Sequence, residues 1–142
     1  MGMMFGQALW VVWLSAGYLL AGRRAEARAH AERALEIARA HQERGYQAYA
    51  LRLLGDIAMQ SHPPQVERAE AYYREALTLA EERGMRPLQA HCHGGLGTLY
   101  TKSSRPEQAR AALSAAIALY RAMDMTFWLP QVEAALAQVE GH

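Results

Sequence analysis

Apolar residues recur along most of the chain at the three- and four-residue spacing of an amphipathic helix. Between residues 25 and 42 one face carries apolar side chains, and arginine and glutamate occupy the other positions. The residues of that apolar face are Ala27, Ala31, Ala34, Leu35 and Ala38. The pattern predicts seven helices, over about 4–21, 25–42, 46–61, 65–83, 87–102, 105–123 and 127–140, and it predicts no strand.

Glycine and proline mark the ends of several predicted helices. Gly45 and Gly84 are the expected C-caps of two helices, because glycine adopts the left-handed conformation without a side-chain clash. The run 62–64 contains two prolines and ends a third helix, since proline lacks the amide donor. Ser104 and Glu107 have the spacing of a capping box, so we expect them to cap the helix that follows.

Short motifs recur at a fixed distance. Leu54-Gly55 reappears as Leu96-Gly97, 42 residues later, and Gln47-Ala48 reappears as Gln89-Ala90. A period of this size is typical of stacked helix pairs. We therefore predict an all-α helical-hairpin solenoid of about three helix pairs plus a C-terminal helix. It forms one domain over 1–142, with units of about 4–44, 46–84 and 87–124 and a terminal helix of about 126–140.

Composition narrows the class of protein. Hydrophobic residues make up 51% of the chain and charged residues 20%, which excludes a disordered chain. The 15 basic and 14 acidic residues are interspersed, so we expect no nucleic-acid partner. A single cysteine, Cys92, excludes an internal disulfide and is compatible with a reducing compartment. We expect a cytoplasmic protein.

The first 22 residues carry no charged side chain and are long enough to approach the thickness of a bilayer. A membrane anchor is therefore one alternative. Arg23 and Arg24 follow the apolar run instead of preceding it, unlike the basic start of a secretory signal. We favour a helix that is covered by protein, and predict that it self-associates as a homodimer, because the next helix cannot cover all of its large apolar side chains. These side chains are Met4, Phe5, Trp10, Val11, Trp13 and Leu14.

The sequence contains few groups of residues that could bind a metal ion, catalyse a reaction or bind phosphate. His91 and His93 flank Cys92, but residues two apart on a helix point about 200° apart, so we predict no metal site. We expect no cofactor and no catalytic activity, since the glutamates of 65–83 are typical of solvated helix faces and Glu70 is correctly spaced to pair with Arg74. The glycines of 94–97 lack the strand and lysine of a phosphate loop and indicate close helix packing.

Small residues at the predicted helix contacts resemble the tetratricopeptide repeat, whose pattern places Leu-Gly in the first helix and spaced alanines in the second. The third unit matches at Leu96, Gly97, Tyr100, Ala109, Leu113 and Ala116, and the second at Leu54, Gly55, Ala58, Ala69, Tyr73 and Ala76. The first unit matches less well, with Ser15 in place of the glycine. The longer period is also similar to repeat arrays at the C-terminal end of bacterial ATPase or nucleotide-cyclase signalling regulators.

The resemblance implies a superhelix whose concave face is lined by the first helix of each pair. Its groove positions fall here on Tyr49, Arg52, Asp56, Met59 and Gln60, and on His91, Gly94, Thr98, Thr101 and Lys102. The resemblance therefore implies a non-catalytic module that binds a protein, peptide or helix in this groove. The alternatives are a dimerising or spacing segment of a larger bacterial signalling regulator and a membrane-anchored adaptor.

Overall fold

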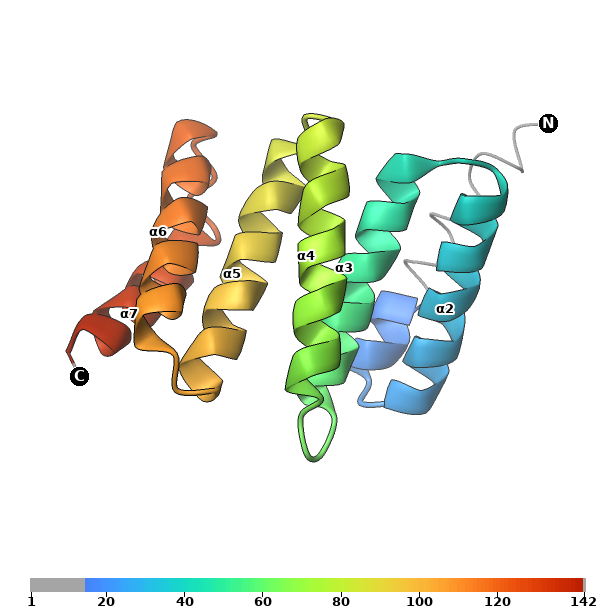
Figure 1. The fold of residues 1–142 in the computed structure, drawn as a ribbon, viewed down its shortest axis with the longest axis horizontal. Coiled ribbons are helices and arrows are strands. Elements are labelled where there is room, and N and C mark those ends of the chain that lie inside the picture. The colour runs from blue at the N-terminus through green and yellow to red at the C-terminus, as the bar shows by residue number, and fades with distance from the viewer. Residues whose placement is uncertain (1–14, 142) are drawn as a thin grey trace.

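The computed structural model describes residues 15–141, and these residues form helices and no strand. Residues 15–20 are helical and precede six further helices, which follow one another from one end of the molecule to the other (Figure 1). These helices are α2 (Arg24–Ala40), α3 (Arg44–Gln60), α4 (Val66–Glu82), α5 (Arg86–Lys102), α6 (Pro106–Ala122) and α7 (Leu129–Glu140). The prediction of an all-α helical-hairpin solenoid is confirmed. None of the helices described is both long and apolar enough to span a membrane.

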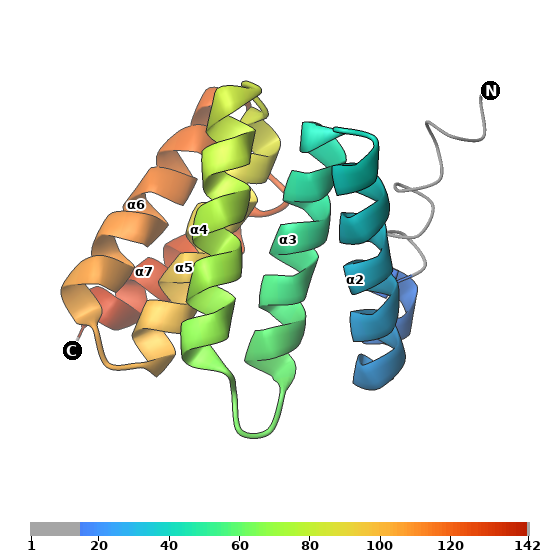
Figure 2. The same ribbon diagram turned by 45° about the vertical axis from the view of Figure 1, so that its right-hand side comes forward.

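Neighbouring helices alternate in direction. The two helices of one hairpin pack against each other more extensively than helices of different hairpins do. Figure 2 shows α3 and α4 side by side, joined by the loop of residues 61–65. The closest helix pairs are α3 with α4 and α5 with α6. Across hairpins, α3 also contacts α5, and α5 contacts α7, whereas α2, α4 and α6 do not contact one another. The helices α3, α5 and α7 therefore line the inner face of the array.

One turn geometry is used at four connections between successive helices. At the end of α4, the Gly84 amide donates to the Glu81 carbonyl and the Met85 amide donates to the Ala80 carbonyl. These two bonds form a Schellman motif, and Gly84 has the positive φ of 65° that the motif requires. Met85 is also the N-cap of α5, so the next helix begins at once. Equivalent bonds precede α2, α3 and α6.

Two of the predicted helix ends are wrong. Gly45 does not cap α2, because it lies inside α3, and Gln42 takes the left-handed conformation with φ 55°. Ser104 does not form a capping box with Glu107, since Ser104 itself is the left-handed residue of the preceding turn and Arg105 is the N-cap of α6. The last helix begins at Leu129, two residues later than expected. The Schellman turns impose these positions, because each of them needs one left-handed residue at a fixed point after the helix, which here is Gln42 or Ser104.

The repeated glutamines stabilise equivalent turns. The Gln47 side chain donates to the Ala38 carbonyl at 3.4 Å, and the Gln89 side chain donates to the Ala80 carbonyl at 3.3 Å. Each of these carbonyls also accepts the longer bond of a Schellman motif. The recurrence of glutamine after 42 residues therefore corresponds to one hydrogen bond from its side chain to the preceding helix, at the start of α3 and again at the start of α5.

Small residues occupy the points where the two helices of a hairpin approach most closely. A Cβ placed on Gly97 would lie 2.4 Å from the Leu113 side chain, and one placed on Gly55 would lie 2.8 Å from the Tyr73 ring. Ser15 holds the corresponding place in the first unit, where it is fully buried and donates its hydroxyl to the Ala27 carbonyl. The Leu-Gly echo thus marks the crossing point of each hairpin, as the sequence predicts.

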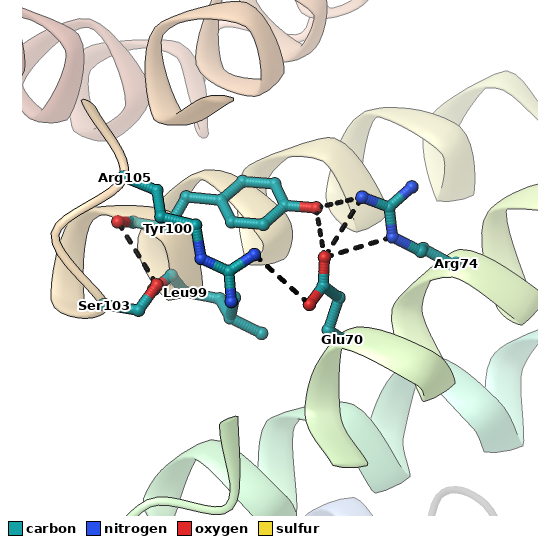
Figure 3. A network of polar contacts seen from close by, with 6 residues as sticks. All are labelled: Glu70, Arg74, Leu99, Tyr100, Ser103 and Arg105. Atoms are coloured by element: carbon teal, nitrogen blue, oxygen red, sulfur yellow. Dashed lines mark hydrogen bonds and ion pairs between the residues drawn. The ribbon is translucent and has the colours of Figure 1, made fainter. Parts of the chain in front are cut away.

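A polar network joins the second and third hairpins on the side of the array shown in Figure 3. Glu70 of α4 accepts the Tyr100 hydroxyl at 2.7 Å and pairs with Arg74 at 3.0 Å and with Arg105 at 3.5 Å (Figure 3). The Tyr100 hydrogen bond, reinforced by the two arginines, holds the pKa of Glu70 below its ordinary value. The predicted pair with Arg74 is present, but Glu70 is largely buried and is not part of a solvated face.

Candidate functional site

A cleft of about 340 Å³ lies on the inner face of the array, where α3, α5 and α7 meet the inward side chains of α4 and α6. Such a volume is at the lower end of the range of small-ligand pockets, about 300–1,000 Å³. An α-helix with its side chains is about 10–12 Å across. The cleft is therefore suited to a short extended segment or a few side chains, and not to a whole helix.

The structure brings eight of the ten predicted groove residues to this one cleft. Arg52, Asp56 and Gln60 come from α3, and His91, Thr98 and Lys102 come from α5. Met59 and Gly94, which the resemblance also placed in the groove, line it too. Tyr49 and Thr101 are not among the lining residues. Tyr49 lies near the start of α3 and is exposed, and the Thr101 hydroxyl donates to the Gly97 carbonyl within α5.

One wall of the cleft is a polar cluster of α3 and α4. The Tyr73 hydroxyl donates to Asp56, and Arg52 Nε lies 3.4 Å from the other carboxylate oxygen of Asp56. Burial raises the pKa of Asp56, while the positive charge of Arg52 and the Tyr73 hydrogen bond oppose that rise. Burial and the adjacent carboxylate raise the pKa of Tyr73 far above its ordinary value, so this phenol stays protonated.

The Tyr73 ring explains a glycine that the repeat pattern does not require. Tyr73 is 2% exposed, and its ring is held between Gly55 of its own hairpin and Gly95 of the next one. A Cβ on Gly95 would lie 2.7 Å from this ring. The equivalent of Tyr73 in the next hairpin is Leu113, which contacts Gly97 in the same way. Gly95 is therefore a packing residue, as the sequence analysis expects for this run.

The opposite wall is aromatic. His91 Nδ1 and the Tyr120 hydroxyl are hydrogen-bonded at 2.6 Å, and the ring of His91 makes an edge contact with Trp128 at 5.1 Å between centroids. Burial, together with the positive charge of Arg52, lowers the pKa of His91 to about 4, so the imidazole is neutral at pH 7. Burial likewise raises the pKa of Tyr120 to about 12.

Trp128 enters the cleft because one connection differs from the others. Met125 completes the same turn that closes four earlier connections, yet α7 begins only at Leu129. The three additional residues, 126–128, place Trp128 in the cleft lining, and Phe127 makes an edge-to-face contact with it at 4.9 Å between centroids. Phe127 is 74% exposed and Trp128 is 37% exposed. This pair was not predicted from the sequence. The signal that could have found it is the connection from α6 to α7, which is three residues longer than the connections before α3, α5 and α6.

Gly94 forms an open part of the cleft floor. A Cβ on Gly94 would meet no atom within 4 Å, in contrast to Gly95 and Gly97. A glycine in a helix interior costs about 1 kcal/mol relative to alanine. Close packing accounts for that cost at Gly95 and Gly97, as predicted, but the packing prediction is wrong for Gly94.

The single cysteine and the exposed glutamates of the described residues have ordinary structural surroundings. Burial raises the pKa of Cys92 to about 12, which leaves a protonated and poorly nucleophilic thiol. Within residues 15–141, no group of three His, Cys, Asp or Glu side chains is placed to hold a metal ion. Glu75 and Glu82 form exposed ion pairs with Arg39 and Arg44. The cleft offers binding groups instead of a nucleophile with a base.

The predicted self-association residues, between Met4 and Leu14, lie outside the described residues. The helical residues 15–20 that follow them end in Leu20, whose side chain is 91% exposed.

Comparison with known proteins identifies part of the chain. The family model of the tetratricopeptide repeat matches residues 65–122, which comprise α4, α5 and α6. No curated protein matches the chain. Proteins of this family are generally non-catalytic modules that bind other proteins. The match supports a tetratricopeptide-repeat assignment for residues 65–122, and it indicates a protein–protein interaction module.

Proposed function

We propose that the chain is an interaction module whose inner cleft binds a short, acidic segment of a partner protein. The observation that carries the proposal is the convergence of α3, α5 and α7 on one cleft that is lined by polar and aromatic side chains. Grooves of this kind recognise extended segments through a few side-chain pockets on a rigid scaffold. The helices here supply such a scaffold, since their turns and crossing points are repeated and closely packed.

Charge favours an acidic segment. The charged residues that line the cleft are Arg52 and Lys102, which are positive, and Asp56, which is negative. Asp56 is already engaged by Tyr73 and Arg52. Lys102 is exposed and makes no ion pair with any other residue of 15–141. A carboxylate of the partner would complete this charge arrangement, and such attraction weakens as salt is added.

The test begins with a random dodecapeptide library displayed on phage and panned on the purified full chain. Enriched peptides are synthesised, and their affinity is measured by fluorescence anisotropy at low and high salt. Lys102→Glu should weaken binding at least tenfold, because it reverses the charge at the cleft. The matched control is Arg110→Glu, which makes the same reversal on the exposed part of α6 outside the cleft. Absence of enrichment, or equal affinity for both variants, contradicts the proposal.

A second proposal concerns self-association through the apolar first segment. It rests on the sequence of residues 4–14 and on the exposed Leu20 that follows them. Light scattering across a dilution series should give the mass of a dimer for the chain, and of a monomer after Trp10→Glu and Val11→Glu are combined. A mass that these changes leave unaltered contradicts it. Removal of residues 1–22 tests the alternative of a membrane-anchored adaptor. Such an adaptor would bind lipid vesicles only while these residues are present.

The remaining alternative is a spacer in a larger bacterial signalling regulator located in the cytoplasm. Such a segment would require its helical surface for assembly but would not require the cleft. Lys102→Glu would then leave regulation by the parent protein unchanged, whereas changes at Trp10 would not.

A further inference from the structure

We infer that the cleft has a specific anchor subsite over Gly94, which takes an aromatic side chain of the bound segment. This inference rests on the proposed peptide-binding function, and it deepens that function by naming the anchor. Three features of the described residues carry it: the open space at Gly94, the aromatic groups around that space, and the positive charge beside it.

The open space is the first feature. Gly94 and His91 are one helical turn apart on the same face of α5, and Thr98 follows one turn later. A Cβ at position 94 would meet no atom within 4 Å, and Gly94 lines the cleft, so the space over it is open. Glycine at this point lets a ligand approach the helix backbone directly, which is one of the uses of glycine near bound ligands. Packing inside the protein does not account for Gly94.

The second feature is the set of rings on the N-terminal side of the space. His91 hydrogen-bonds to Tyr120 and makes edge contacts with both Tyr120 and Trp128. Phe127 extends the aromatic surface beyond the cleft lining through its edge contact with Trp128. Aromatic side chains prefer such edge-to-face and offset arrangements with one another. An aromatic ring of the ligand therefore fits this wall better than a branched aliphatic side chain does.

The inserted residues 126–128 strengthen this argument. The other Schellman connections lead directly into the next helix, so the solenoid does not need these three residues for its continuation. Their effect is to expose Phe127 and to place Trp128 in the cleft lining. An aromatic pair that the repeat geometry does not require, beside an unfilled glycine, indicates an anchor site for a ligand.

The charge of Arg52 indicates whether the rings of this wall bind a cation or a neutral aromatic side chain. A cluster of rings can also bind a cation, but here Arg52 lines the same cleft. The positive charge of Arg52 contributes to the lowered pKa of His91, so its field extends to the aromatic wall and disfavours a second cation there. The electron-rich face of an aromatic side chain complements the guanidinium group. The ligand side chain is thus a neutral aromatic one.

The experiment pans the dodecapeptide library in parallel on the wild-type chain and on Gly94→Leu. Leucine at position 94 would fill the space over the glycine and is favourable in a helix. The wild type should enrich peptides with one aromatic residue at a fixed position next to acidic residues. The synthesised consensus peptide should bind Gly94→Leu at least tenfold more weakly, and Gly94→Ala more weakly by a smaller factor. Replacing its aromatic residue by leucine should also weaken binding to the wild type at least tenfold.

The controls separate loss of the subsite from loss of the fold. Ala111→Leu introduces the same side chain, leucine, on the exposed face of α6 and should leave binding unchanged. Trp128→Ala should weaken binding of the consensus peptide as Gly94→Leu does. The melting temperature of Gly94→Leu should be equal to or higher than that of the wild type, because no packed atom is displaced.

Different outcomes overturn the two proposals. If Lys102→Glu abolishes binding while Gly94→Leu does not, the cleft binds peptides but the anchor over Gly94 is wrong. Enrichment of aliphatic or basic peptides also overturns the aromatic anchor. If no peptide is enriched, or if neither variant changes the affinity of those that are, both the anchor and the peptide-binding function are wrong.

Discussion

At the residue scale, Gly94 and Gly95 are adjacent in sequence but opposite in physical role. Gly94→Ala should raise the free energy of unfolding by about 1 kcal/mol, because alanine is the better helix former and its methyl group enters open space. Gly95→Ala should lower it by about 1–3 kcal/mol, because the methyl group would overlap the buried Tyr73 ring. Urea unfolding followed by circular dichroism measures both values. Shifts of the same sign for the two variants would contradict these assignments.

The second prediction at this scale is that the stability of the fold depends on pH through His91. Its pKa is lowered to about 4 in the folded chain, against an ordinary value of 6.5. Below pH 6.5 the unfolded chain takes up a proton at His91 that the folded chain refuses until about pH 4. The contribution of His91 to stability is therefore complete above pH 6.5, and it is lost progressively as the pH falls to about 4.

Comparison with His91→Gln measures that contribution. The carboxyl groups titrate in both proteins and largely cancel in the difference between them. The free energy of unfolding of the wild type should decline more steeply between pH 6.5 and 4 than that of the variant. Parallel pH profiles would show that His91 is solvated and not held in the cleft wall.

At the element scale, the Glu70 network connects α4 to the end of α5 and the start of α6. Tyr100→Phe removes the hydrogen bond that most lowers the pKa of Glu70. We expect this change to cost about 1–2 kcal/mol of stability at pH 7, as hydrogen bonds to charged groups commonly do. A lowered carboxyl pKa contributes its full stabilisation above the ordinary value of 4.5 and loses it progressively at lower pH, so the cost should shrink as the pH falls toward 3.

Urea unfolding at pH 7 and pH 3 tests this network. Tyr72→Phe is the matched control. Tyr72 is a partly buried tyrosine of α4, the helix of Glu70, and the structure shows no hydrogen bond from its hydroxyl to another described residue. It should change stability little at either pH. A cost for Tyr100→Phe that is the same at pH 7 and pH 3 would mean that the hydroxyl contributes through packing and not through Glu70.

Most of the elements were predictable because their signals are local. Spaced apolar residues gave the bounds of α2 to α7 within about two residues, and the Leu-Gly echo marked the hairpin crossings, whereas most of the first predicted helix lies outside the described residues. Helix caps were less predictable, since Gln42 and Ser104 take a conformation that glycine usually adopts. Their side chains give no indication of it. The position of the left-handed residue is set by where the preceding helix ends, and that depends on packing between helices.

The cleft was predictable only in part, for a similar reason. The resemblance to the tetratricopeptide repeat supplied the groove positions on α3 and α5, so Arg52, His91 and Lys102 could be assigned to one face, and all three line the cleft. The contribution of Trp128 depends on where α7 begins, and spacing within a helix cannot give that. The separate roles of Gly94 and Gly95 depend on which tyrosine of the neighbouring hairpin lies against them. That contact is tertiary.

At the scale of the whole molecule, each helix depends on its neighbours along the array. The inner helix α5 contacts helices of both adjoining hairpins, whereas α7 is described in contact with α6 and α5 alone. Only Val139 of α7 is buried, compared with seven residues of α5. Local opening of α7 should therefore need less free energy than opening of α5.

Hydrogen exchange followed by mass spectrometry tests this gradient. We expect the backbone amides of α7 to exchange faster than those of α3 and α5, and addition of a cleft-binding peptide to slow α7 most. That selective protection follows because Trp128 and Val132 line the cleft, so a ligand there adds contacts to the least supported helix. Protection spread evenly over the array would instead indicate a single cooperative unit. Protection confined to α2, which contributes no residue to the cleft, would place the ligand outside it.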